Sequence, residues 1–298
     1  MIARIIFLSC ISMNISTSEI EHLKQWVGRQ EILTDNITLA PVRALSATLD
    51  RNDAEPAIGD ILPELWHWLY FLPHHRQSEI GTDGHAKRGG FLPPVPLPRR
   101  MWAGGRLQWH QAIKLGDAVK RVSTIESVTH KSGRTGDLVF VLVKHEIFTP
   151  NGLALTEEHD IVYRPLAAPG ETPPPPTAAI KESAWTKDIH PDDVLLFRYS
   201  ALTFNGHRIH YDRKYVTEVE GYPGLIVHGP LIATQLVDLF RENMPGKSLS
   251  KFEFRALRPT FDINDFQVKG SVNADGTLSL WALDHEGWLT MQASATLL

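Results

Sequence analysis

A proline-rich stretch divides the chain into two parts and limits the folds that it can adopt. Four consecutive prolines occupy positions 173–176, within a segment of alanine, threonine and glycine over 166–184. Consecutive prolines favour an extended, semi-rigid spacer of about 3.1 Å per residue. We therefore expect a linker at 166–184 between an N-terminal domain at 18–165 and a C-terminal domain at 185–298. The total of 298 residues is enough for two domains of ordinary size.

The first part has the pattern of one helix followed by several strands. Asp60 is a candidate N-cap for a helix over 61–70, whose apolar positions Ile61, Leu65, Trp68 and Leu69 repeat at helical spacing. Runs rich in β-branched residues follow at 119–130, 137–148 and 155–163, separated by turns that contain glycine. These runs predict antiparallel strands.

The second part repeats the same order of elements. Pro230 suits the first turn of a helix over 230–241. Strands are expected at 252–260, 265–272, 278–284 and 288–297. The pattern predicts a duplicated α+β fold, with each helix wrapped by its own curved antiparallel sheet. We expect the halves to pack against each other through two sheets, not to form one continuous sheet.

Composition excludes several classes of protein. Apolar residues make up 43% and charged residues 21% of the chain, and the net charge is −4. These values are typical of a globular protein and predict no affinity for nucleic acid. Cys10 is the single cysteine, so no intramolecular disulfide is expected, and we predict a reducing, cytoplasmic location. Residues 1–17 are interpreted as a tail or a translation start placed too early, and no stretch predicts a membrane span.

The second part also contains the densest group of residues that can hold a proton or a polar substrate atom. Asn205, His207, His210 and Asp212 lie within one short segment, and His228-Gly229-Pro230 follows at the predicted helix start. Free N–H groups at a helix start can receive a carbonyl or phosphate oxygen. Together these features indicate acid/base chemistry on an acyl group.

This arrangement resembles the MaoC-type hydratases and dehydratases. Asn205-Gly-His-Arg-Ile-His210, followed by His228-Gly229, resembles a subgroup of mesaconyl-C4-CoA (3-methylfumaryl-CoA) hydratases, itaconyl-CoA hydratases and mitochondrial 3-hydroxyacyl-thioester dehydratases. The segments 66–71 and 98–106 resemble the same subgroup. We expect the first domain to supply the acyl/CoA pocket and the second to carry the catalytic segment, and the aromatic residues of 66–71 either line that pocket or pack the core. The resemblance implies a tandem hot-dog fold and a lyase that needs no cofactor, with an acyl-CoA thioester as substrate.

The resemblance also implies roles for individual residues. His210 falls at the family's histidine, and an imidazole can take up and release a proton near neutral pH. Asn205 stands where the family has an aspartate, and an amide does not titrate. Two explanations stay open: His210 works with Asn205 holding the water, or another carboxylate replaces the aspartate. Asp212 is the nearest candidate for that carboxylate, since on a strand it would share a face with His210, and Asp60 and Glu64 are more remote.

The remaining candidates concern substrate binding. His207 is expected to bond the substrate or to hold its neighbours. His228 and Gly229 are expected to receive the thioester carbonyl at the helix start. Guanidinium groups bind carboxylate and phosphate, so the candidates for the anionic parts of a dicarboxylic acyl-CoA are Arg99, Arg100, Arg255 and Arg258. The histidine spacing matches no standard zinc motif, so no metal is predicted.

The predicted function is hydration of an α,β-unsaturated short-chain acyl-CoA, with mesaconyl-C4- or itaconyl-CoA favoured by the resemblance. Dehydration of 3-hydroxyacyl thioesters of fatty-acid metabolism is an alternative. Thioester hydrolysis and a non-catalytic acyl-binding module are further alternatives, since a fold does not decide a function. A homodimer is left open.

Overall fold

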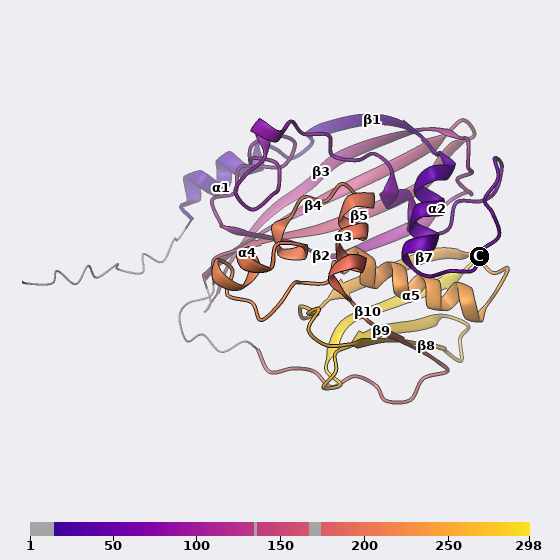
Figure 1. Cartoon of the computed structure of the whole chain (residues 1–298). Helices are drawn as coiled ribbons and strands as arrows, with labels where there is room; N and C mark the ends of the chain where they lie inside the picture. Colours follow the sequence, from indigo (N-terminus) through magenta and orange to yellow (C-terminus); the bar gives the residue numbers. More distant parts are fainter. Residues whose placement is uncertain (1–14, 134–135, 167–173) are drawn as a thin grey trace, which may run out of the picture.

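The computed structural model describes residues 15–133, 136–166 and 174–298 and contains a ten-stranded antiparallel sheet (Figure 1). The first half of the chain supplies β1 (Gln30–Asn36), β2 (Arg99–Trp109), β3 (Ala118–Gly133), β4 (Gly136–Thr149) and β5 (Gly152–Arg164). The second half supplies β6 (Trp185–Ile189), β7 (Leu249–Ala256), β8 (Phe266–Val272), β9 (Leu278–Leu283) and β10 (Leu289–Leu297). The strand order is β1-β3-β4-β5-β2-β7-β10-β9-β8-β6, so each half forms one contiguous side of the sheet.

The halves meet edge to edge where β2 pairs with β7. The register runs from Gly104 opposite Arg255 to Gln108 opposite Lys251. A Cβ atom on Gly104 would lie 2.6 Å from the Phe254 carbonyl oxygen, so this close strand approach requires glycine. The expectation of two separate sheets is therefore wrong: β2 and β7 each have a free edge until they pair, and their pairing satisfies both.

Five helices accompany the sheet in the described residues: α1 (Thr17–Lys24), α2 (Leu39–Thr48), α3 (Asp193–Leu202), α4 (Arg213–Glu218) and α5 (Gly229–Asn243). Short 3₁₀ turns are η1 (Trp66–Leu69), η2 (Gln77–Glu79) and η3 (Arg208–His210). The helix α5 lies across the strands of the second half (Figure 1), and every residue from Leu231 to Phe240 is buried. This confirms the helix predicted over 230–241.

The helix predicted over 61–70 is absent, and α2 is the larger helix of the first half. Pro63 disfavours helical geometry at the residue before it. Leu65 and Phe71 have φ values of 69° and 56°, which end any regular helix on both sides of the turn η1. The Asp60 carboxylate accepts a hydrogen bond from the Ala57 N–H and caps no helix.

The turn η1 is fixed by a buried carboxylate. Glu157 on β5 accepts hydrogen bonds from His67 (2.9 Å), from the Trp68 indole (2.8 Å) and from His159 (2.7 Å). A buried carboxylate is tolerated when donors of this kind surround it. Trp66, Tyr70 and Phe71 are buried in the apolar core, so this aromatic segment packs the core rather than lining an acyl pocket.

One apolar core spans both halves. It joins α2, η1 and α5 with the inner faces of β2, β7, β8, β9 and β10. A buried ion pair also crosses between the halves, because Asp238 on α5 lies 3.3 Å from Arg51 and 2.9 Å from Arg241. A smaller apolar cluster lies between α1 and the strands β3, β4 and β5.

The described part of the predicted linker lies against the second half. The Leu289 N–H donates to the Thr177 carbonyl (2.8 Å), and the Trp281 indole donates to the Ile180 carbonyl (3.2 Å). Cys10, the predicted tail up to residue 14 and part of the linker at 167–173 lie outside the described residues.

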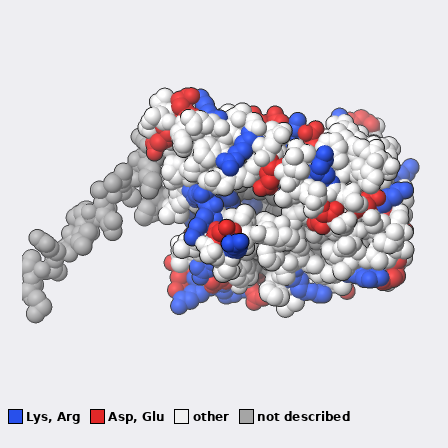
Figure 2. Space-filling model, turned by 90° about the horizontal axis from the view of Figure 1, so that it is seen from above, with Lys and Arg blue, Asp and Glu red and all other residues white. Residues whose placement is uncertain are grey.

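Two expectations about surface and membrane can be compared with the structure. Among the described residues, no helix has the length and apolar character needed to cross a membrane. Lys and Arg side chains are interspersed with Asp and Glu over the face drawn in Figure 2. That face therefore lacks the continuous basic surface on which nucleic acids are usually bound.

Candidate active site

The segment between α3 and α4 forms a tight loop that presents the predicted site residues. Phe204 has a φ of 49°, and the Asn205 N–H donates to the Ser200 carbonyl at 2.8 Å, which turns the chain at the end of α3. The Asn205 side-chain oxygen accepts a hydrogen bond from the His207 N–H at 3.0 Å. This local turn uses the oxygen of the amide and leaves its NH₂ group for another acceptor.

His210 ends the turn η3 and is held in one tautomer. Its Nδ1 lies 2.7 Å from the Ile226 carbonyl oxygen. Because a carbonyl only accepts, Nδ1 carries the hydrogen and Nε2 keeps a lone pair. Burial lowers the pKa of His210 to about 4, which outweighs the hydrogen bond to Ile226. At neutral pH the side chain is therefore an uncharged base.

The ring of His228 packs against the ring of His210. The two rings are stacked, with centroids 3.7 Å apart, and His228 Nε2 lies 2.8 Å from the Ser200 hydroxyl oxygen. The Nδ1 of His228 is buried and has no hydrogen-bond partner among the described residues. Burial, followed by the neighbouring His210 and His207, holds the pKa of His228 well below its usual value. His228 thus contacts the site as a neutral ring.

The start of α5 has the geometry expected for a carbonyl site. His228 is the N-cap, but its side chain forms no capping hydrogen bond. The N–H groups of the first turn have no acceptor within the helix. A Cβ atom on Gly229 would lie 3.9 Å from the Met291 side chain, an ordinary contact, so packing alone does not require glycine there. Donors at this helix start can stabilise a developing oxyanion.

Asp212 does not replace the missing aspartate. Its carboxylate accepts from the Tyr215 N–H (3.0 Å) as the N-cap of α4 and pairs with Arg208 at 2.7 Å. The hydrogen bond from Tyr215, followed by that from Arg208, lowers the pKa of Asp212. The prediction that it shares a strand face with His210 is wrong, because the segment forms a 3₁₀ turn and a helix start. Glu64 accepts from the Leu249 N–H, which places it on the seam between the halves.

A loop of the first half lies against this segment. The sequence pattern did not predict this contact. The Arg208 N–H donates to the Asp83 carbonyl at 2.9 Å, and the Arg208 guanidinium donates to the Thr82 carbonyl at 2.9 Å. Gly84 and Gly206 touch through their backbones: a Cβ on Gly84, whose φ is +89°, would lie 1.8 Å from the Gly206 oxygen. The two halves of the chain therefore build the site together.

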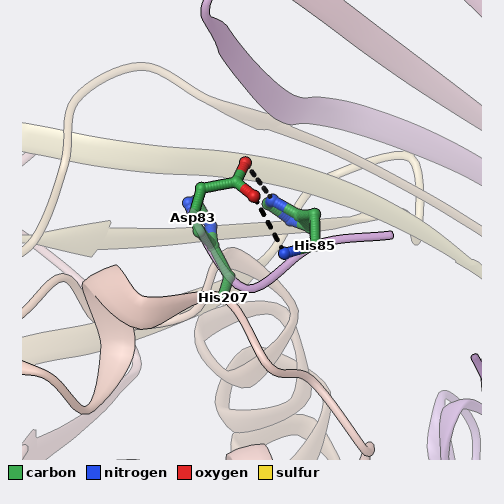
Figure 3. A group of neighbouring side chains, drawn as sticks. All are labelled: Asp83, His85 and His207. Carbon is green, nitrogen blue, oxygen red and sulfur yellow. Dashed lines mark hydrogen bonds and ion pairs between the residues drawn. The ribbon is translucent and has the colours of Figure 1, made fainter. Parts of the chain in front are cut away.

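This loop brings a carboxylate and an imidazole beside His207. The His85 Nδ1 lies 3.0 Å from one Asp83 carboxylate oxygen, and the His85 N–H donates to the other at 3.0 Å (Figure 3). The rings of His85 and His207 lie 3.9 Å apart, and those of His207 and His210 lie 5.4 Å apart. Three imidazoles and one carboxylate thus form a continuous group, with His207 in the middle.

The charges of this group follow from its burial. Burial alone would raise the pKa of Asp83, but the hydrogen bonds and charge of His85 lower it well below its usual value. Burial, followed by the charge of His85, strongly lowers the pKa of His207. The pKa of His85 is lowered by burial, although its hydrogen bond to Asp83 opposes the shift. At neutral pH the site holds one carboxylate among neutral imidazoles.

Asp83, His85 and His207 each offer one ligand atom within 4.8 Å of the others. Two imidazoles and a carboxylate are donors that divalent metals also use. The positive charge of Arg100, which acts on both His85 and His207, opposes a second cation at this point. The absence of a metal stays a prediction.

The four candidate arginines are placed very differently. Arg100, on β2 opposite Tyr163, is half-buried, contributes to the lowered pKa of His207, and has no ion pair among the described residues. Arg99 is bound to Glu220, to whose carbonyl oxygen it donates at 2.9 Å. Arg255 is exposed and points away from the α5 face, because Phe252 and Phe254 occupy that face of β7.

Arg258 lies beyond the end of β7, half-buried, and its backbone N–H donates to the Thr290 carbonyl at 3.2 Å. Its guanidinium forms no hydrogen bond or ion pair within the described part of the chain. Arg100 is therefore the one predicted arginine that the structure connects with the histidines.

Comparison with known proteins finds relatives by sequence and by fold. Residues 65–262 match the family described as "Hydroxyacyl-thioester dehydratase type 2". The mesaconyl-C4-CoA hydratase of Chloroflexus aurantiacus is 44% identical over 272 residues, which cover 91% of this chain and 96% of that protein.

Solved structures share the fold at low identity. A MaoC-like dehydratase from Phytophthora capsici aligns with a TM-score of 0.67 at 12% identity, covering 94% of this chain and 97% of that one. A Mycobacterium tuberculosis protein described as a double hotdog fold aligns with a TM-score of 0.56 at 13% identity, over 94% of this chain and 98% of that one. These alignments confirm the predicted tandem hot-dog fold.

The fold is that of the MaoC-like double hot-dog proteins, and the match to a dehydratase family together with the identity to a hydratase identifies the chain as a hydro-lyase. The match over residues 65–262 and the 44% identity to a hydratase place the chain more narrowly. It belongs to the hydroxyacyl-thioester dehydratase type 2 family. The resemblance inferred from the sequence is thereby confirmed.

Proposed function

We propose that this protein hydrates the double bond of a short-chain, α,β-unsaturated dicarboxylic acyl-CoA, with mesaconyl-C4-CoA as the first candidate and itaconyl-CoA as the second. The 44% identity to a mesaconyl-C4-CoA hydratase, over nearly the full length of both chains, is the observation that carries this proposal. The geometry of the imidazoles and of the helix start supports the reaction type.

The chemistry follows from the neutral site. The thioester oxygen receives N–H groups at Gly229 and the first turn of α5, which stabilise the enolate-like state that forms when water adds. His210 Nε2, which carries a lone pair, accepts a hydrogen of the attacking water. The free NH₂ group of Asn205 is the donor that holds the water oxygen. Because these groups handle protons without redox chemistry, we propose that the reaction needs no cofactor.

Arg100 is the proposed partner of the distal carboxylate. It lies within electrostatic reach of His207, and it acts on the buried hydroxyl of its strand neighbour Tyr163. A carboxylate there would receive donors from both side chains. A charged hydrogen bond in such a setting contributes about 1.5–3 kcal/mol, or roughly 10- to 150-fold in affinity.

The test is a comparison of substrates by loss of enoyl absorbance. Mesaconyl-C4-CoA should turn over with a kcat/KM at least about tenfold above that of crotonyl-CoA, which lacks the distal carboxylate. Arg100→Gln should abolish this preference, whereas Arg255→Gln, a matched change on the far face of the sheet, should preserve it. Equal rates with both substrates in the wild type would refute the dicarboxylate proposal.

Dehydration of a 3-hydroxyacyl thioester is the second candidate, favoured by the family to which residues 65–262 belong. A 3-hydroxyacyl-CoA with a long alkyl chain would then be a better substrate than any dicarboxylic thioester, and Arg100→Gln would leave its rate unchanged. We also propose a cytoplasmic location, on the ground of the single cysteine. A homodimer is a further proposal, to be tested by light scattering.

A further inference from the structure

The amide of Asn205 leaves the site without the titrating partner that an aspartate would give to His210. Among the described residues no carboxylate pairs with His210, and its stacked neighbour His228 is neutral and bonded to a hydroxyl. Adding water across a double bond requires one group to carry a proton for part of the reaction, and an imidazole that does so becomes positively charged. Forming that charge on a buried, unpaired imidazole is costly.

The geometry assigns this task to His85: we propose that His85, oriented by Asp83, is the second acid/base group of the active site and replaces the missing aspartate. The proposal rests on the hydration reaction proposed above and names a further participant in it. Asp83 and His85 come from the first half of the chain, in which the sequence shows no counterpart of the 205–210 segment.

The tautomer of His85 follows from its partner. An ionised carboxylate only accepts hydrogen bonds, so the 3.0 Å contact to Asp83 places the hydrogen on Nδ1 and the lone pair on Nε2. His210 has the same arrangement through Ile226. The site thus has two imidazoles with a free lone pair on Nε2, one from each half, separated by the ring of His207.

The two imidazoles differ in their ability to carry charge. A proton on His85 would lie beside the Asp83 carboxylate, whereas a proton on His210 would face only a carbonyl dipole. The charged groups that act on His85 are Asp83, Arg88 and Arg100, with His207 as its titratable neighbour on the other half. Asp83 is the one anion among them, so its contact decides which imidazole becomes the cation.

The proposed step balances without any further reactant. The water oxygen forms a bond to the β-carbon while one of its protons moves to His85 Nε2, and His210 Nε2 accepts the other hydrogen in a hydrogen bond. The π electrons of the double bond pass to the thioester oxygen at the start of α5. The His85 imidazolium then returns its proton to the α-carbon, which restores the neutral site and leaves a hydroxyacyl thioester.

The loop that carries the pair is fixed to the second half by backbone contacts. The hydrogen bond from Arg208 to the Asp83 carbonyl and the close approach of Gly84 to Gly206 do not involve either functional side chain. Changing the side chains of Asp83 and His85 should therefore leave the loop in place. This allows a test in which folding and chemistry separate.

The experiment compares His85→Gln, Asp83→Asn and the double variant with a matched control pair. His190 and Asp265 form an equivalent imidazole–carboxylate contact of 2.6 Å, with 74% and 65% of their side chains exposed, so His190→Gln and Asp265→Asn serve as controls. The rates are measured with a thioester that the wild-type protein hydrates. His85→Gln should lower kcat by about 10²–10⁴-fold relative to the wild type. KM should change by less than about threefold, because the lost interaction belongs to the transition state.

Asp83→Asn should lower kcat by about 10²-fold, through misorientation of His85. The double variant should be no worse than His85→Gln alone, because the carboxylate acts through the imidazole. Loss of the anion lowers the pKa of His85, so the acid limb of kcat/KM should move to lower pH in Asp83→Asn. A merely structural role would not move this limb. The control variants should match the wild type.

Three results would overturn the proposal. His85→Gln could retain more than about a third of the wild-type kcat while His210→Ala is inactive, which would leave the hydratase function intact and remove His85 from it. The acid limb could be unchanged in Asp83→Asn. A chelator could abolish the rate and stoichiometric Zn²⁺ restore it through Asp83, His85 and His207, which would make the group a metal site.

If the proposed function itself is wrong, the wild-type protein will hydrate none of the enoyl thioesters. In that case ¹⁵N NMR of the histidine rings still tests the pair. His85 should carry its hydrogen on Nδ1 in the wild type and lose this preference in Asp83→Asn. A hydrogen on Nε2 of wild-type His85 would overturn the proposal without any assay of activity.

Discussion

Gly84→Ala should displace the first-half loop while leaving the side chains of Asp83 and His85 unchanged, so it tests the position of the loop by itself. The added Cβ would lie 1.8 Å from the Gly206 carbonyl oxygen and 3.2 Å from the Arg208 nitrogen. A normal Cβ–oxygen contact exceeds 3 Å, so the loop and the 206–208 segment must separate by roughly 1 Å. A misplacement of this size can lower a rate by about 10²-fold.

The variant also places alanine at a φ of +89°, which costs about 1–2 kcal/mol in stability. Gly276→Ala is the matched control, because Gly276 has a φ of +83° and no atom within 4 Å of an added Cβ. Gly276→Ala should therefore lose a few degrees of Tm through its backbone alone, and Gly84→Ala at least as much, because the contact with Gly206 adds to the cost. Only Gly84→Ala should lose kcat, by about 10²-fold. The reasoning is refuted if Gly84→Ala keeps kcat within about threefold of the control, measured by enoyl absorbance.

Other predictions follow from the same geometry. His210→Ala should lower kcat by about 10²–10⁴-fold and His207→Ala by less, with circular dichroism unchanged; a rate above about a third of wild type would exclude His210 from the reaction. Asn205→Asp should add a titrating group and shift the pH–rate profile, and an unchanged profile would place Asn205 outside the proton path. His210, whose pKa is about 4 when folded and near 6.5 when unfolded, should destabilise the protein as pH falls from about 6.5 to 4. The contribution of His210 should approach about 3 kcal/mol, because the unfolded chain binds the proton more readily, and in urea titrations the loss should be smaller by about this amount in His210→Gln.

The elements predicted best from the sequence are those whose secondary structure is determined by their local residue pattern. The strand β4 alternates in burial, glycines mark an end of β3, β4 and β5, and the helix α5 is buried from Leu231 to Phe240, so periodicity and turn signals were sufficient. The strand β2 escaped prediction because Gly104 and Gly105 interrupt its pattern. Gly104 is explained by the approach of β7, and Gly105 by the Glu158 carbonyl on β5 together with the Phe254 ring on β7, which are contacts between residues far apart in the sequence.

The helix predicted over 61–70 failed for a related reason. Its apolar spacing is real, but the buried carboxylate of Glu157 draws His67 and Trp68 into a 3₁₀ turn, and the sequence does not show that contact. The sequence does carry signals for α2, namely an N-cap residue, a proline in the first turn and apolar positions at helical spacing. These residues are Thr38, Pro41, Val42, Leu45 and Leu49.

The candidate site was predicted in part. Asn205, His207, His210 and His228 come together as the segment and the helix start indicate, whereas Asp212 and Arg255 do not join them. Asp83 and His85 could not be found from spacing, because more than a hundred residues separate them from His207 and contacts between distant loops bring them together. Asp-Gly-His reads as an ordinary turn until its partner is known.

The central claim is that this protein adds water to the double bond and leaves the thioester intact. Incubation of mesaconyl-C4-CoA with the wild-type protein in water labelled with oxygen-18, followed by mass spectrometry, tests it most directly. The account predicts a hydroxyacyl-CoA that carries one oxygen-18 atom on the acyl chain, with no release of free CoA. Release of free CoA together with an acid labelled at its carboxylate would show hydrolysis instead and contradict the account.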